Sequence, residues 1–122
     1  MQKIEIIFYQ KANGSKPAEE FIESLSKSEK KKIYHVVDML SDRGGDLRMP
    51  YSRYLEDGIY ELRANASRVL YFFIVRSSAV LTNGFTKKTN KTPRDQIEKA
   101  KRYREDYSIR LDKKEGNKNN VE

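Results

Sequence analysis

The sequence predicts an α+β domain: a small antiparallel or mixed sheet of four to five strands, an N-terminal helical hairpin and a C-terminal helix. Apolar and polar residues alternate near the N-terminus and again over residues 59–64, which is the period of strands, and residues 68–85 are rich in strand-forming residues. Residues 17–40 instead show the spacing of apolar helix stripes, and a helix-start signature follows the last strand. A chain of 122 residues has room for one such domain.

The N-terminal part of the chain is expected to form one strand and two helices. Residues 4–8 alternate as a strand, which the turn Asn13-Gly14 ends. Pro17 suits the first turn of one helix, Ser28 is expected to cap the next, and Gly44-Gly45 stops it. The apolar stripes are Ala18, Phe21, Ile22 and Leu25 in the first helix and Ile33, Val36, Val37 and Leu40 in the second. The two helices therefore make a hairpin.

After Pro50 the pattern changes to that of strands. Ile59–Ala64 alternates, with Glu61 and Arg63 on the face opposite the apolar one. Residues 65–67 are expected to turn the chain into Arg68–Val75, which is apolar on both faces as in a central strand. Residues 79–85 supply a further strand, and Tyr71, Phe72 and Phe73 are expected in the core.

The last helix has a clear start. Thr92 is expected to cap it, Pro93 to occupy its first position, and Asp95 to favour its positive end. Residues 112–122 are polar without periodicity, which predicts a disordered tail, so the folded domain is expected to span residues 1–111. The helix residues expected to face the sheet are Ala100, Tyr103 and Tyr107.

Composition excludes several classes of protein. The chain has no cysteine, so it has no disulfide, thiolate nucleophile or cysteine-bound metal. No apolar run approaches the roughly 20 residues of a membrane span, which predicts a cytoplasmic protein without a membrane partner. His35 is the sole histidine and is expected to be a partly exposed helix residue. No metal site and no cofactor are expected, because carboxylates are scattered without ligand spacing.

Positive charge is concentrated in one segment. Between Gly84 and Arg104 there are eight Lys or Arg and two acids, whereas the whole chain has a net charge of +7. Clustering of this kind is typical of proteins that bind phosphate-rich partners, and nucleic acid is the first candidate. The cations are Lys87, Lys88, Lys91, Arg94, Lys99, Lys101, Arg102 and Arg104.

Consecutive pairing of the last strands would bring Arg63, Arg68 and the lysines after Phe85 to one end of the sheet, a site suited to a phosphodiester. A purely structural interpretation stays open at this point. Arg68 can pair with Glu61 or Glu56, and the helix cations can be the solvated side of an amphipathic helix. Composition and spacing predict an anion-binding domain and no more.

Three motifs in order carry a resemblance. The segments 58–63 (GIYELR), 68–73 (RVLYFF) and 84–93 (GFTKKTNKTP) resemble the phage-derived branch of the RelE/HigB toxins of type II toxin–antitoxin systems, over about residues 3–107. The resemblance implies a microbial RNase-like fold and a metal-independent endoribonuclease, an mRNA interferase that cuts messenger RNA on the ribosome. It also implies a cognate antitoxin, expected to be a helix-turn-helix protein.

The resemblance also implies roles for single residues. Arg68 matches the arginine that faces the scissile phosphate, and Lys88 falls near a second catalytic arginine. Arg63 and Lys87 match further cations of the pattern, so the four are the candidate catalytic residues. The general base stays open between Tyr51, Tyr71, Glu61 and a lysine. The candidate RNA contacts are Lys91, Arg94, Lys99, Lys101, Arg102, Tyr51 and Tyr54.

Two other functions fit the same observations. A ParE-like toxin on this fold would inhibit DNA gyrase without any chemistry, and fold alone does not separate the two toxins. A basic protein that only binds nucleic acid is the second alternative. Converging cations favour the nuclease, because a gyrase inhibitor has no need to surround one phosphate.

Overall fold

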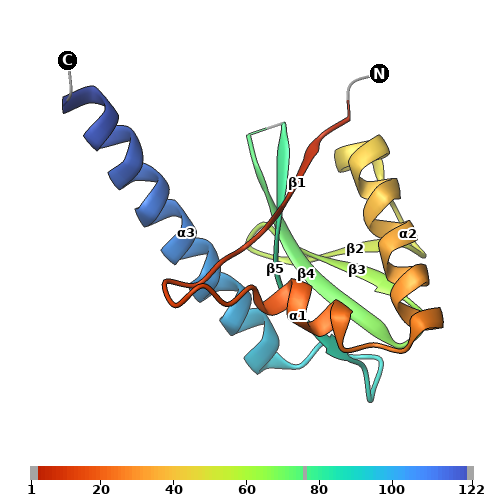
Figure 1. Cartoon of the computed structure of the whole chain (residues 1–122). Coiled ribbons are helices and arrows are strands. Elements are labelled where there is room, and N and C mark those ends of the chain that lie inside the picture. Colours follow the sequence, from red (N-terminus) through yellow and green to blue (C-terminus); the bar gives the residue numbers. More distant parts are fainter. Residues whose placement is uncertain (1–2, 76, 121–122) are drawn as a thin grey trace.

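The computed structural model describes residues 3–75 and 77–120, with side chains described as far as Lys114 (Figure 1). The α+β class predicted from the sequence is confirmed. In chain order the elements are β1 (Glu5–Phe8), α1 (Pro17–Glu23), α2 (Lys27–Arg43), the 3-10 turn η1 (Gly44–Asp46), β2 (Ser52–Glu56), β3 (Ile59–Ala64), β4 (Ser67–Ile74), β5 (Ser78–Thr86) and α3 (Arg94–Asn120).

The five strands form one mixed sheet in the order β1-β5-β4-β3-β2. β1 runs parallel to β5, whereas β2 to β5 pair antiparallel with their neighbours in sequence. Parallel pairing of β1 needs a long crossover, which α1 and α2 provide before the chain enters the antiparallel strands. The sequence left open an antiparallel or a mixed sheet, and the chain forms the mixed one.

The helices cover the two faces of the sheet separately, as Figure 1 shows. α1 and α2 pack on one face, where Leu62, Val69 and Tyr71 join their apolar stripes. α3 packs on the other face, where Ala100 and Tyr103 lie against a cluster that includes Leu70. Successive residues of β4 thus enter opposite cores, which explains why this strand is almost continuously apolar.

One edge strand was not predicted. After Pro50 the first strand expected was Ile59–Ala64, yet Ser52–Glu56 forms β2 and pairs with β3. A two-residue turn joins the strands at Asp57-Gly58, where both residues have positive φ (49° and 77°). Asp-Gly is the typical sequence of such tight hairpins, so the dipeptide was the signal for this strand.

Two helix boundaries also differ from expectation. Ser26, not Ser28, caps α2, because its side chain accepts a hydrogen bond from the Glu29 N–H in a Ser-x-x-Glu capping box. The tail expected to be disordered continues α3 as far as Asn120. Its first residues include the good helix formers Lys113 and Lys114, and it has no proline to stop the helix.

Candidate functional site

A buried glutamate lies at the centre of the candidate site. Glu61 is on the face of β3 that points toward α3, and 1% of it is exposed to solvent. Thr92, in the loop just before α3, donates a hydrogen bond of 2.6 Å from Oγ1 to Glu61 Oε2. The threonine expected to cap the helix instead holds this loop against the sheet, because its hydroxyl oxygen accepts a hydrogen bond from Arg53 Nη2 at 3.1 Å.

Three arginine side chains surround the other carboxylate oxygen. Glu61 Oε1 lies 3.5 Å from Arg53 Nη2, 3.7 Å from Arg63 Nε and 3.8 Å from Arg68 Nε. These are ion-pair distances, and Oε1 has no hydrogen-bond partner among the described residues. The strands assemble the group by register, since Arg53 pairs with Glu61 and Arg63 with Arg68. We call these four residues the arginine cluster; it carries two more positive than negative charges.

The three arginines differ in their access to solvent. The side chains of Arg53, Arg63 and Arg68 are 37%, 20% and 5% exposed. Arg68 Nη1 also donates to the carbonyl oxygens of Asn65 (2.7 Å) and Ser67 (3.0 Å), which ties it to the β3–β4 turn. Burial, and next the nearby Arg63, lower the pKa of the Arg68 guanidinium. An anion arriving from solvent therefore meets Arg53 and Arg63 first, with Arg68 beneath them.

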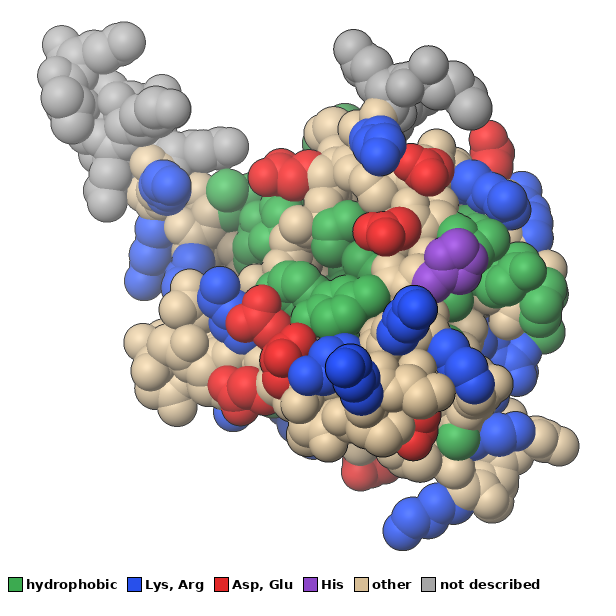
Figure 2. Space-filling view, turned by 45° about the vertical axis from the view of Figure 1, so that its right-hand side comes forward, with side chains coloured by type: hydrophobic (Ala, Val, Ile, Leu, Met, Phe, Trp, Pro, Cys, Tyr) green, Lys and Arg blue, Asp and Glu red, His purple; other side chains and the backbone are tan. Residues whose placement is uncertain are grey.

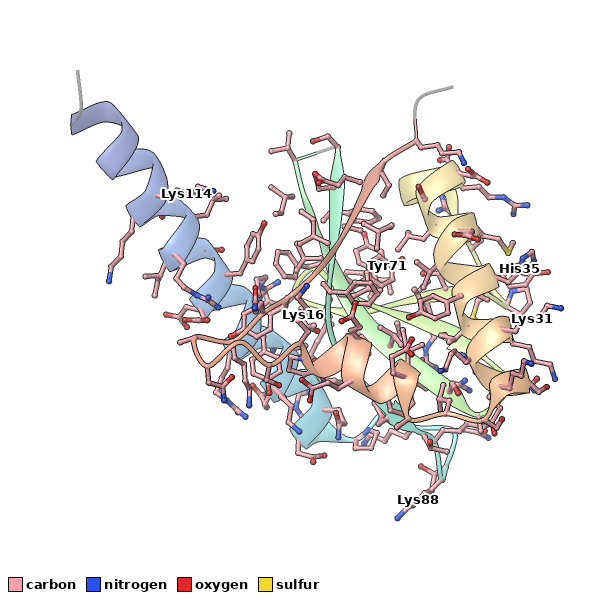
Figure 3. The ribbon with its side chains drawn as sticks, in the orientation of Figure 1. Lys16, Lys31, His35, Tyr71, Lys88 and Lys114 are labelled. Carbon is pink, nitrogen blue, oxygen red and sulfur yellow. The ribbon has the colours of Figure 1, made fainter. Side chains whose placement is uncertain are left out.

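The structure brings together two of the four predicted catalytic residues, Arg63 and Arg68. Lys87 lies beside the β3–β4 turn, where its backbone N–H donates to Ala66 O at 2.8 Å. Figure 3 shows Lys88 projecting from the tip of the β5–α3 loop into solvent. The expected convergence of Lys88 with Arg68 is absent from this structure, because the loop turns away from the sheet before it returns at Thr92.

A cleft of about 540 Å³ opens next to the arginine cluster, between β2 and the start of α3. Lys91, a predicted RNA contact, lines it together with Arg53 and Tyr54. Tyr54 is 54% exposed, and its ring packs edge-on against Tyr60 with the centroids 5.1 Å apart. These residues give the cleft cations beside an accessible aromatic ring.

Two predicted RNA contacts on α3 are held in ion pairs. Arg94 Nη1 lies 2.7 Å from Glu56 Oε1, and Lys101 Nζ lies 2.6 Å from Glu56 Oε2. Hydrogen bonds from Arg94 and then Lys101 lower the pKa of Glu56 to about 2. Lys99 and Arg102 form no ion pair within the described part of the chain, and Arg102 is exposed.

The tyrosines proposed as bases lie outside the arginine cluster. Tyr71 is 1% exposed on the α1/α2 face, where its hydroxyl is 2.6 Å from Ser52 Oγ. Burial raises the pKa of Tyr71 to about 12, so it holds its proton at neutral pH. Tyr51 is exposed and lines a separate cavity beside α2.

Sequence reasoning missed Arg53 as a member of the cluster, because its side chain is placed by the unpredicted strand β2. Among the side chains of residues 3–75 and 77–114, no group of three or more His, Asp and Glu lies close enough to hold a metal ion. Within the same residues, no helix combines the length and the apolar character needed to cross a membrane.

Comparison with known proteins decides the family. The sequence profile described as phage derived protein Gp49-like matches residues 20–105, which is most of the chain. The chain belongs to this family. The resemblance to the phage-derived RelE/HigB branch, inferred from three motifs, is thereby confirmed.

A solved structure shows the same fold. One chain of the toxin–antitoxin complex RelBE2 from Mycobacterium tuberculosis superposes with a TM-score of 0.53 at 13% identity, covering 70% of this Gp49-like chain and 99% of its own length. The likeness is one of fold, that is, of the arrangement of helices and strands. No curated protein sequence matches the chain at a significant level.

Proposed function

We propose that this Gp49-like protein is the toxin of a toxin–antitoxin system and cleaves messenger RNA on the ribosome. The observation that supports this best is the arginine cluster, in which three guanidinium groups share one buried carboxylate at loose distances. Family membership and the fold shared with a chain of a toxin–antitoxin complex support the toxin assignment. An antitoxin and the translating ribosome are the proposed partners.

The proposed chemistry uses the RNA itself as nucleophile. The ribose 2′-hydroxyl attacks the adjacent phosphorus, its proton leaves, and the bond to the 5′ oxygen breaks as that oxygen gains a proton. Negative charge builds up on the pentacoordinate phosphorus in between, and fixed cations stabilise it without reorganisation. The excess of two positive charges in the arginine cluster matches a doubly charged phosphorane.

Glu61 acts as a positioning residue in this proposal. It is 1% exposed and bound by Thr92, so it aims the guanidinium groups instead of reaching the ribose. Its distances of 3.5–3.8 Å to the arginine nitrogens are too long for strong hydrogen bonds, so Glu61 holds the three guanidinium groups only loosely. A phosphate that enters between Arg53 and Arg63 would exchange weak pairs with Glu61 for charge-assisted hydrogen bonds.

Expression of the chain alone tests this function. Incorporation of radiolabelled amino acids should fall before that of thymidine, and purified protein should cut mRNA on translating ribosomes. Thymidine incorporation falling first, with an SOS response, would point to gyrase inhibition. Growth that continues with the protein present in soluble, folded form would exclude a toxin.

A further inference from the structure

A second basic region lies on the face of the sheet opposite the arginine cluster. A groove of about 930 Å³ runs between α2 and the β3 end of the sheet, and the loop before β2 closes one side. This volume is within the range that holds several side chains of a bound partner. None of the groove's lining residues except Arg63 and Tyr51 was a candidate from sequence.

The rim of this groove is positive. α2 contributes Lys27, Lys31 and Lys32, and β3 contributes Arg63, whereas no Asp or Glu lines it. Positions 27 and 31 are one helical turn apart, so both face the groove. None of the three lysines forms an ion pair with the side chains of residues 3–75 and 77–114, and all three are exposed. Figure 2 shows blue side chains gathered around the single histidine, His35, which also lines the groove.

The floor of the groove is apolar and mostly aliphatic. Val36, Pro50 and Ala64 line it, with Tyr51 as its one aromatic residue. Proteins that hold single-stranded nucleic acid stack successive bases on several aromatic rings, which this floor does not offer. A cationic rim over an aliphatic floor instead suits an amphipathic protein segment whose apolar side chains enter the groove while its carboxylates meet the lysines.

We propose that the α2 groove is the docking site for an acidic, amphipathic segment of a protein partner. The identification of that partner as an antitoxin rests on the proposed function; the docking itself does not. The exposed N-terminal half of α2 adds a favourable dipole, because carboxylates are stabilised near a helix N-terminus.

Arg63 connects the groove with the arginine cluster. It lines the groove, its Nη1 lies 3.0 Å from Met49 Sδ, and its Nε is 3.7 Å from Glu61 Oε1. A carboxylate of a docked segment therefore competes with Glu61 for this guanidinium. Docking on one face of the sheet would withdraw a cation from the site on the other face, without covering that site.

Fluorescence anisotropy with a labelled amphipathic peptide of Glu, Leu and Ala tests the docking. The double variant Lys31→Glu/Lys32→Glu should bind the peptide about tenfold more weakly than wild type, because each reversal turns attraction into repulsion. Lys113→Glu/Lys114→Glu is the matched control with the same change in net charge, at the far end of α3 from the groove (Figure 3). Its affinity for the peptide should stay close to that of wild type.

Three outcomes would overturn the proposal. Equal losses in both double variants would indicate only long-range attraction, and no binding of the peptide by folded wild type would remove the site. Poly-uridine that binds with the same dependence on Lys31 and Lys32, while the acidic peptide does not, would assign the groove to RNA. Melting temperatures of both variants establish that the proteins compared are folded.

The coupling through Arg63 has its own measurement. The peptide should slow RNA cleavage by wild-type protein even at saturating RNA, and should not slow the Lys31→Glu/Lys32→Glu variant at the same concentration. Inhibition that vanishes at saturating RNA would mean that the peptide occupies the arginine cluster, against the proposal. A wild-type protein that binds the peptide but cuts no RNA would defeat the proposed function and leave the docking site standing.

Discussion

The cations of α3 and the lysines of the α2 groove differ in whether acidic side chains neutralise them. On α3, Arg94 and Lys101 are bound by Glu56, and Arg104 donates to the Asp57 side chain, so acids from the β2–β3 hairpin neutralise the helix. On α2, the lysines of the groove have no such partners within the described residues. The segment richest in positive charge is thus partly neutralised. Charge counted along a sequence locates cations but does not show which of them are available to a ligand.

The arginine cluster is a third case, because its cations are buried around one acid and still carry an excess of charge. The ion pairs of α3 lie at the surface, and surface ion pairs contribute little to stability. The cluster is different, since removing its single anion leaves three cations close together and poorly solvated. We therefore expect substitutions in the arginine cluster to have larger effects than substitutions in the surface ion pairs of α3.

The largest expected effect is on catalysis. Arg63→Ala should lower single-turnover mRNA cleavage on ribosomes by about two to three orders of magnitude, or roughly 2–4 kcal/mol of transition-state stabilisation. Arg68→Ala should have a similar effect if it remains folded.

Lys88→Ala is the informative comparison for both arginine variants. Its outward position predicts a modest, salt-dependent loss of affinity with cleavage at saturation retained. A loss as large as that of Arg63→Ala would show that the β5–α3 loop closes over the arginine cluster when RNA binds. Cleavage at the wild-type rate by folded Arg63→Ala would remove the cluster as the site.

The next effect is on stability. Glu61→Gln should reduce the free energy of unfolding by about 3 kcal/mol, because the amide leaves three buried or half-buried guanidinium groups without a counter-charge. Denaturant unfolding measures it, with Glu98→Gln, in an exposed pair with Arg94, as the control that should change little. Equal losses of unfolding free energy in the two variants would show that Glu61 contributes no more to stability than the acid of a surface ion pair.

A smaller effect should appear on acidification. The pKa of Glu56 is lowered from 4.5 to about 2, so its ion pairs stabilise the fold above pH 4.5 and lose this contribution as the pH falls toward 2. The difference in melting temperature between wild type and Glu56→Gln should therefore shrink over that range. High salt should shrink it too, since the pairs are exposed. A difference that stays constant with pH would contradict the neutralisation of α3 by Glu56.

The smallest effect is expected from the end of α3. A chain ending at Leu111 should melt at nearly the wild-type temperature, because residues 112–122 are almost wholly polar. RNA cleavage should also persist. A fall of several degrees would show that the last turns of the helix support the domain.

Much of the fold was predictable because it depends on local periodicity. The boundaries of Ile59–Ala64 agree with β3 residue for residue, and the apolar stripes of the two N-terminal helices do face the sheet. β2 escaped prediction because its residues, SRYLE, show no clear apolar alternation and because it is an edge strand that pairs with β3 alone. For the site, Arg63 and Arg68 were found together, whereas Arg53 was not assigned to it.

The sequence by itself determined the α+β class, the order of most elements and the faces on which apolar residues lie. These properties depend on the spacing of apolar residues over about one helical turn or two strand residues, which can be read directly from the sequence. Tertiary structure decided which charges meet. Cross-strand register put Arg53 opposite Glu61, and the packing of α3 placed Arg94 and Lys101 on Glu56. Ion pairs depend on distances of a few ångström between residues far apart in the chain, and no local pattern encodes those distances.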